Sequence, residues 1–273
     1  MPRLACASDD ARMKAILAMA ALAFAVHSVT AASPRAASAA AEARPVLAWK
    51  MADYTFAAAR REGHENWPAR EVHWAYPVFI ASHDRKTGAL NAWLRLQSLD
   101  RLGLGESLRR EATHLSDRQL IARAVADADF IEHEVDQDVI TPRAAAGVYR
   151  SFVVNTEWTE EQRPGHGLEH LLFNLRLERA QGLEALFKPG GDGVLQALFD
   201  AQARRDEPGC DHAGFDWVDA GLLAADSIEF DYAYLSVSDW SECGLGLRIT
   251  SPRIRALLKS PRDLEPDWRL EEH

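Results

Sequence analysis

Alternation between apolar and polar side chains is the sequence feature that most restricts how this chain folds. Across residues 147–158, apolar side chains alternate with polar or hydroxyl-bearing ones, and this period of two is typical of a half-buried strand. A chain with several such segments has to form a sheet with one face against a core. Further strands are predicted at residues 72–80 (interrupted by Pro77), 173–178, 230–234 and 245–249.

Two helices are predicted ahead of most of these strands. The first follows Gly88 and ends near Gly103, with Leu90, Trp93 and Leu94 at helical spacing. Such a stripe of apolar side chains on one helix face indicates packing against the predicted sheet.

The second helix is predicted to begin at Ser116, because Gln119 follows three residues later and completes a capping box. Its apolar positions continue to Val135, and the helix is expected to stop before Pro142. The acidic run at residues 132–138 is then expected on the solvent-exposed face of this helix.

A last helix is predicted from Ser251, an N-cap residue followed by proline at the first helical position, through Leu258. Helices dominate the early part and strands the late part of the chain, without regular strand–helix alternation. The pattern therefore predicts an α+β fold, an antiparallel sheet with packed helices in a single domain.

Residues 1–31 have the order of a secretory signal peptide. Met13 and Lys14 open a short basic region, residues 15–26 form an apolar run, and small residues end at Ala31. The run is well short of the ~20 residues that a membrane-spanning helix needs. Cleavage is therefore expected rather than anchoring, and Met13 is an alternative start.

The composition then changes. Residues 32–44 are rich in alanine, serine and proline and predict a flexible tether. Residues 45–273 are expected to form one envelope domain. No second apolar run of membrane length follows, so the expected product has no membrane span after signal cleavage and is located in the periplasm.

The chain carries 31 basic and 41 acidic residues, a formal net charge of −10. This acidic excess disfavours a nucleic acid partner, because phosphates require a basic face. It is compatible with a cationic protein partner, although an acidic balance also serves solubility alone.

Cys210 and Cys243 are the cysteines that remain once the predicted signal peptide, which contains Cys6, is removed. In an oxidising compartment, such a pair is expected to form a disulfide, which stabilises a chain by roughly 3–4 kcal/mol. A metal or redox pair is the alternative, but the sequence contains no C-x-x-C motif.

Six short strings, in order along the chain, resemble one family. They are YPVF at 76–79, LNAWL at 90–94, GHG at 165–167, FNLRLERAQGLEALF at 173–187, CGLG at 243–246 and SPRIRALL at 251–258. Together they resemble the extracytoplasmic domain shared by lysozyme-sensing anti-sigma factors and by accessory regions of some peptidoglycan deacetylases. The chain departs from that family at residues 164–167, where Pro-Gly-His-Gly replaces the usual Gly-Gly-Ala-His.

The resemblance implies a fold and a place at the cell wall, with binding as the role. Neither a deacetylase domain nor a transmembrane anchor is recognised beside the domain, so the activities of those host proteins are not carried over.

A competing interpretation comes from His166, Glu169 and His170, which form the H-x-x-E-H pattern of some zinc proteases. On a helix, the two histidines would bind zinc, Glu169 would activate water, and Glu242 is a candidate third ligand. Pro164, the neighbouring glycines and the alternation that follows favour a turn leading into a strand. A zinc-dependent hydrolase is thus the alternative function, whereas the main hypothesis includes no cofactor.

Trp217, Tyr232, Tyr234 and Trp240 surround the predicted disulfide segment. They form a candidate binding surface for sugar or protein, although aromatic strand residues are also common in cores. We therefore expect a non-catalytic periplasmic binding protein that acts at the cell wall. The expected partner is peptidoglycan glycan or a cationic wall hydrolase such as lysozyme.

Overall fold

The structure, a computed structural model, divides the chain into two compact units, Met1–Glu42 and Ala43–His273. All of the described residues belong to the second unit. They are residues 46–57, 71–80, 85–126, 135–160, 163–206, 220–230, 247–265 and 269–272.

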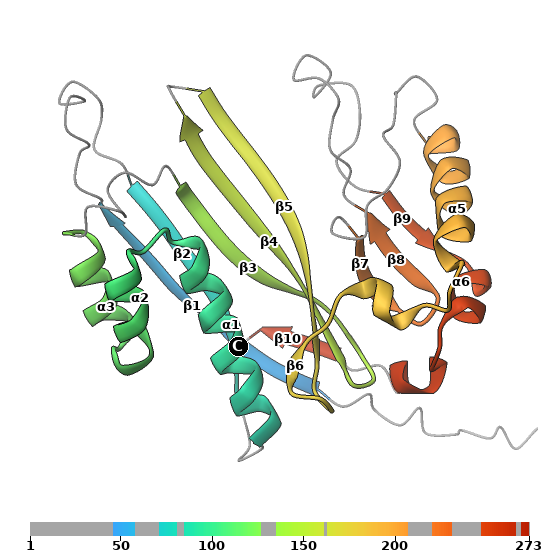
Figure 1. Cartoon of the computed structure of the whole chain (residues 1–273), viewed down its shortest axis with the longest axis horizontal. Helices are drawn as coiled ribbons and strands as arrows, with labels where there is room; N and C mark the ends of the chain where they lie inside the picture. Colours follow the sequence, from blue (N-terminus) through green and yellow to red (C-terminus); the bar gives the residue numbers. More distant parts are fainter. Residues whose placement is uncertain are drawn as a thin grey trace, which may run out of the picture. The chain divides into compact units, whose positions relative to one another are not determined.

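Seven strands form the larger of two sheets, in the order β10-β1-β2-β3-β4-β5-β6 (Figure 1). Neighbouring strands are antiparallel except for the parallel pairs β1–β10 and β2–β3. The strands are β1 (Val46–Ala57), β2 (Glu71–Phe79), β3 (Val135–Ala146), β4 (Tyr149–Glu160), β5 (Arg163–Asn174), β6 (Arg179–Ala180) and β10 (Arg269–Glu272).

A smaller antiparallel sheet and several helices complete the fold. The smaller sheet is β7 (Ala220–Ala224), β8 (Ser227–Phe230) and β9 (Leu247–Thr250). The helices are α1 (Arg85–Arg101), α2 (Glu106–Glu111), α3 (Asp117–Ala124), α5 (Gly191–Asp206) and α6 (Pro252–Leu257), with 3-10 turns η1 (Ala112–His114), η2 (Leu183–Leu186) and η5 (Pro261–Leu264). The predicted α+β class is confirmed. Among the described residues, no helix has the length and apolar character needed to cross a membrane.

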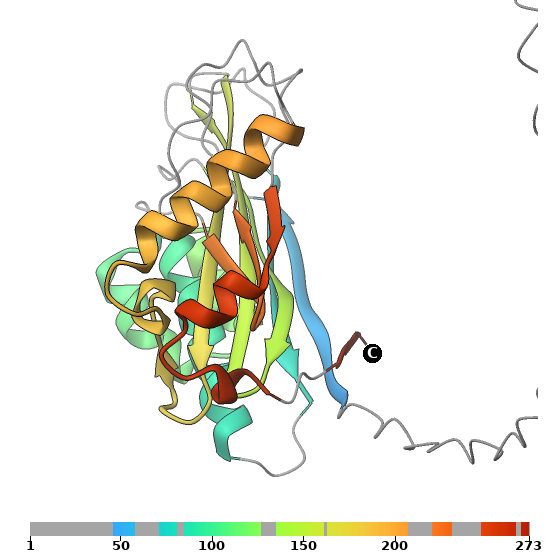
Figure 2. The same cartoon turned by 90° about the vertical axis from the view of Figure 1, so that its right-hand side faces the viewer.

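The two faces of the larger sheet are covered by different elements. Helix α1 packs on one face, against β2 and β3, and the smaller sheet meets the other face through β7. Figure 2 shows α5 and α6 in front of the smaller sheet, with the larger sheet behind it. The layers are therefore helix, sheet, sheet and helix, with a separate core on each side of the larger sheet.

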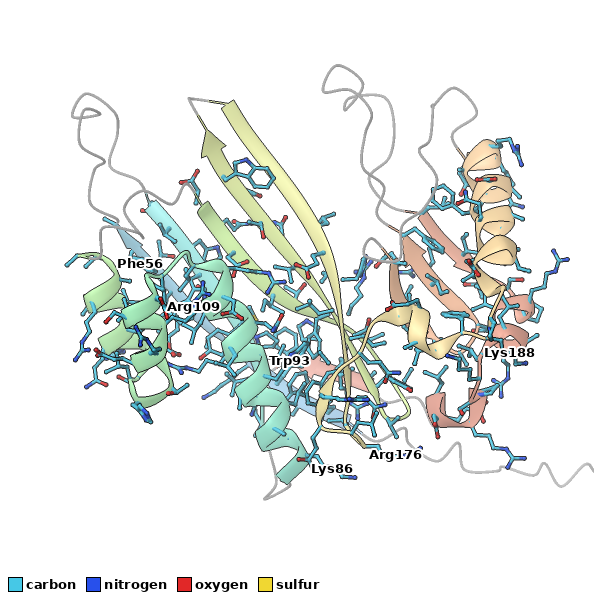
Figure 3. The ribbon with its side chains drawn as sticks, in the orientation of Figure 1. Phe56, Lys86, Trp93, Arg109, Arg176 and Lys188 are labelled. Carbon is cyan, nitrogen blue, oxygen red and sulfur yellow. The ribbon has the colours of Figure 1, made fainter. Side chains whose placement is uncertain are left out.

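The first core lies between α1 and the larger sheet. Trp93 of α1 points at the sheet (Figure 3), with its ring centroid 4.9 Å from that of Phe173 and 5.9 Å from that of Phe152. Trp74 is fully buried, and its indole N–H donates to Ser98 of α1. Aromatic side chains thus supply much of the apolar area that holds this helix to the sheet.

The second core joins the β3–β4 hairpin to the smaller sheet, α5 and α6. Phe199 of α5 meets Phe230 of β8 edge to face, with ring centroids 5.5 Å apart. Leu195, Ile228 and Ile254 are fully buried beside them. This core therefore depends on segments that are far apart in the sequence.

Strand β2 continues through Pro77, which was predicted to break it. The Ile80 N–H donates to the Ala48 carbonyl of β1 at 2.9 Å. Because backbone N–H groups along a strand point alternately to its two sides, the backbone nitrogen of Pro77, three residues earlier, faces away from β1. Pairing with β3 ends at Ala75, and Pro77 needs no N–H there. Beyond it, the Asn91 amide of α1 pairs with both the N–H and the carbonyl of Phe79.

The helix predicted from Ser116 begins as expected but ends early. The capping box is present, with the Ser116 N–H donating to Gln119 Oε1 at 2.9 Å. However, α3 stops at Ala124 and Val135–Ala146 is strand β3. The prediction was wrong because Asp138, an acidic residue, occupies a buried position of the strand and conceals its apolar period.

The strand predicted over residues 173–178 was also wrong. Alternation predicted a strand over residues 173–178, but β5 ends at Asn174 and a turn follows, in which Glu178 has a φ of 51°. Asn174 Oδ1 accepts from the backbone N–H groups of Arg176 and Leu177, a local bond that competes with strand extension.

Candidate functional site

The H-x-x-E-H motif lies within β5 rather than on a helix. Glu169 pairs with Val154 and His170 with Val153 of β4, so their side chains leave opposite faces of the sheet. The backbones of His166 and His170 are about 13 Å apart at a rise of ~3.3 Å per residue. The helical geometry that the zinc hydrolase requires is therefore not the geometry of this segment.

No group of three or more histidine, cysteine, aspartate or glutamate side chains could hold a metal ion in the part of the chain that the structure describes. The remaining predicted site residues lie outside the described residues. These are Cys210, Cys243, Trp217, Tyr232, Tyr234, Trp240 and Glu242, together with the side chain of His166.

Glu169 instead joins a charged cluster on the face covered by α1. It forms an ion pair with Arg101, the last residue of α1, and Asp138 lies nearby on β3. Asp138 is 0% exposed, and Thr156 donates to its Oδ1 over a long 3.4 Å. Its Oδ2 has no hydrogen-bond partner among the described residues.

Burial raises the pKa of Asp138 to about 7, and the negative charge of Glu169 adds to the increase. The positive charge of Arg101 and the hydrogen bond from Thr156 act in the opposite direction but are weaker. A carboxyl group removed from water favours its neutral form. Asp138 therefore changes charge near neutral pH, although the sequence indicated a solvated acid.

His170 lies on the opposite face, between the two sheets. A Cβ at Gly221 of β7 would lie 2.2 Å from His170 Nδ1, so only glycine allows β7 to come this close. Glu229 of β8 accepts from Arg143 of β3 and forms an ion pair with Arg248. Burial opposes the ionised form of Glu229, but Arg143, Arg248 and His170 together lower its pKa.

A surface pocket with polar walls lies at the turn of the β3–β4 hairpin. Three separate parts of the chain form it: the start of β4, the segment around η2, and the α6–η5 connection. Its volume is about 160 Å³. The lining residues are Tyr149, Gln181, Ala185, Leu186, Leu258, Lys259, Ser260, Asp263 and Leu264.

Tyr149 forms one side of this pocket and is nearly buried. Burial raises the pKa of its hydroxyl, and the negative charge of Asp263 adds to the increase, while Arg176 and a hydrogen bond with Asn174 act against it. The hydroxyl therefore stays protonated at neutral pH and can both donate and accept. The residues of this pocket come from segments that are distant in the sequence, so no motif marks it. The pocket was therefore not predicted from the sequence.

Comparison with known proteins gives a likeness of fold. No family model matches the chain, and no curated protein matches it in sequence. A solved member of the DUF3298 family from Bacteroides fragilis is 14% identical, with a TM-score of 0.53 over 80% of this chain and 96% of that one. A DUF3298 family protein from Pseudomonas aeruginosa is 11% identical, with a TM-score of 0.45 over 79% and 95% of the two chains. In fold, this chain is similar to the DUF3298 protein from Bacteroides fragilis.

Proposed function

We propose that this chain is a non-catalytic binding protein of the cell envelope that acts at the cell wall. Its principal partner in this proposal is a cationic wall hydrolase such as lysozyme. The signal-like N-terminus supports export, and the family resemblance of the sequence supports a role at the wall. The fold likeness to a DUF3298 protein agrees with that resemblance but says nothing of a partner.

The observation that carries the proposal is the distribution of charge along the chain. Ten acidic residues and no lysine or arginine lie between Arg205 and Arg248. Six acidic residues, of which Asp138 is buried, and no lysine or arginine lie between Arg123 and Arg143. Stretches that carry only negative charge attract a basic protein and mainly increase its association rate.

Binding to lysozyme at low and high salt tests this proposal directly. Exposed charges are screened beyond ~8–10 Å at physiological ionic strength, so we expect the association rate to fall as salt rises. The matched experiment changes Asp206, Asp211, Asp216 and Asp219 to asparagine. The control changes the net charge by the same amount outside the two acidic stretches, with Asp100→Asn, Glu106→Gln, Asp192→Asn and Glu265→Gln.

The first set of changes should slow association and the control set should not. Equal effects would mean that net charge alone matters, and no binding at low salt would exclude lysozyme as a partner.

Wall glycan is the second candidate partner, and the polar pocket beside Tyr149 favours it. A few polar groups that converge on one pocket can fix the orientation of a small molecule, and Lys259 and Asp263 line this one. Saturable binding to purified glycan strands at high salt, where lysozyme binding is screened, would support this candidate.

A further inference from the structure

The pocket beside Tyr149 is built on a short antiparallel contact between two loops. Phe187 and Leu258 form a β-bridge. On either side of it, the Lys188 N–H donates to Leu257 and the Lys259 N–H to Leu186, both at 2.9 Å. The loops are thereby held in fixed register, and so are the side chains that project from them.

Two lysines occupy equivalent positions in this contact. Lys259 Nζ donates to the Ala185 carbonyl at 2.9 Å, and Lys188 Nζ donates to the Ala256 carbonyl at 2.7 Å. Only Lys259 lines the pocket; Lys188 (Figure 3) follows η2 and does not. The chain therefore contains its own matched control for the ammonium group in the pocket.

Asp263 also lines the pocket and is held from two directions. Its carbonyl accepts from the Val148 N–H at 2.9 Å, and its Oδ1 pairs with Arg176 Nη2 at 2.9 Å. The Asp263 carboxylate is thus fixed in position, and its charge is partly offset by Arg176.

The polar groups of the pocket retain hydrogen-bonding capacity. An ammonium group has three donors, and one of those on Lys259 is used by Ala185. A carboxylate accepts up to about four hydrogen bonds, which leaves sites on Asp263. Leu186, Leu258 and Leu264 also line the pocket and are buried, so the surface open to a ligand is mainly polar.

We propose that this pocket binds one sugar ring of a wall glycan. A pyranose has an apolar face of C–H groups and a rim of hydroxyls that both donate and accept. Lys259 and Asp263 can donate to and accept from adjacent hydroxyls of such a ring.

The size of the pocket limits the ligand to a single ring. Its 160 Å³ is below the ~300–1,000 Å³ typical of sites for drug-sized molecules. One ring held by a few hydrogen bonds should bind with a dissociation constant of about 1 mM, and with little dependence on salt. This inference rests on the glycan branch of the proposed function.

The test measures binding of the full-length chain to N-acetylglucosamine oligomers and to purified glycan strands by calorimetry and ligand-observed NMR. Lys259→Met should weaken binding about tenfold, the equivalent of one charge-assisted hydrogen bond. Ala185→Trp should abolish binding, because Ala185 is exposed at the pocket and an indole would fill it. Lys188→Met should bind within about twofold of the unaltered chain.

The outcomes separate the two levels of the proposal. If the unaltered chain binds no glycan, the glycan branch of the proposed function fails. If it binds glycan but Lys259→Met and Ala185→Trp bind equally well, only the assignment to this pocket is overturned. Binding of a zwitterionic dipeptide in place of sugar would also overturn the assignment.

Discussion

On the face of the larger sheet covered by α1, the charged and polar side chains around Asp117 bind one another, whereas the opposite side leaves polar groups around an open pocket. Asp117 accepts from Tyr54 at 2.9 Å, Tyr76 at 2.6 Å and Arg95 at 2.8 Å. In the pocket, the Lys259 ammonium donates to Ala185 and the Asp263 carboxylate pairs with Arg176, and both groups retain hydrogen-bonding capacity. The difference indicates that the first side stabilises the fold and the second is available to a ligand.

The largest expected effect concerns Asp138 and pH. An unfolded aspartate titrates near 3.8, whereas burial raises the pKa of Asp138 to about 7. Between these values the folded chain holds the proton more tightly, so the free energy of unfolding falls as pH rises through this window and then levels off. At about 1.4 kcal/mol per pH unit, the loss is about 4 kcal/mol.

Asp138→Asn should remove this loss, so its stability relative to the unaltered chain should increase from pH 4 to pH 8. Urea unfolding across that range measures the difference, with the exposed Asp100→Asn as control. The same pH profile for both variants would show that Asp138 is not held in its neutral form.

Removal of Asp117 should cost about 3 kcal/mol, because it would leave Arg95 and two tyrosine hydroxyls without their shared acceptor. Asp192→Ala is a matched control, since Asp192 is also an aspartate in the first turn of a helix. It should cost no more than ~1 kcal/mol. Thermal and urea unfolding of both variants give the comparison, and similar losses would show that helix electrostatics, not the network, is the cause.

Gly147→Ala should cost about 2 kcal/mol more than Gly190→Ala. Both glycines have positive φ, 54° and 77°, so both variants carry backbone strain of about 1–2 kcal/mol. Only at Gly147 would the new Cβ meet another atom, the Asp263 carbonyl oxygen at 2.1 Å, while Gly190 faces open space. Because the new Cβ would displace Asp263, Gly147→Ala should also weaken glycan binding. Equal losses of stability in the two variants would mean that the loop containing Asp263 moves aside without cost.

The smallest expected effect is on the pocket side. Lys259→Met and Lys188→Met should each change the free energy of unfolding by less than about 0.5 kcal/mol, as is usual for exposed side chains. A loss of 2 kcal/mol or more in Lys259→Met would assign that lysine to folding and remove the contrast between the two sides.

Much of the local structure could be predicted from the sequence. The first helix, the capping box at Ser116 and the N-cap at Ser251, whose Oγ accepts from the Arg253 N–H, were all recognised. These features depend on residues within a few positions of one another, so their signals are contained in short windows.

Longer-range features were not predicted. Strand β1 was missed because its apolar residues do not keep one alternating pattern. The partly buried side chains stand at odd positions first (Leu47 and Trp49) and at even positions later (Tyr54 and Phe56). Strand β3 (Val135–Ala146) was missed because the buried acidic residue Asp138 conceals its apolar period. The predicted disulfide and aromatic surface lie outside the described residues and remain predictions.

The sequence by itself determined the α+β class, the capped starts of α3 and α6 and the uneven distribution of charge, because each follows from composition or from neighbouring residues. Only the tertiary structure decided that Asp138 is buried beside Arg101, and that Lys259 and Asp263 face one pocket with Tyr149. The physical reason is that desolvation and convergence depend on which strands pair and which loops meet. Those pairings join residues about 20 to more than 100 positions apart, and no local pattern records them.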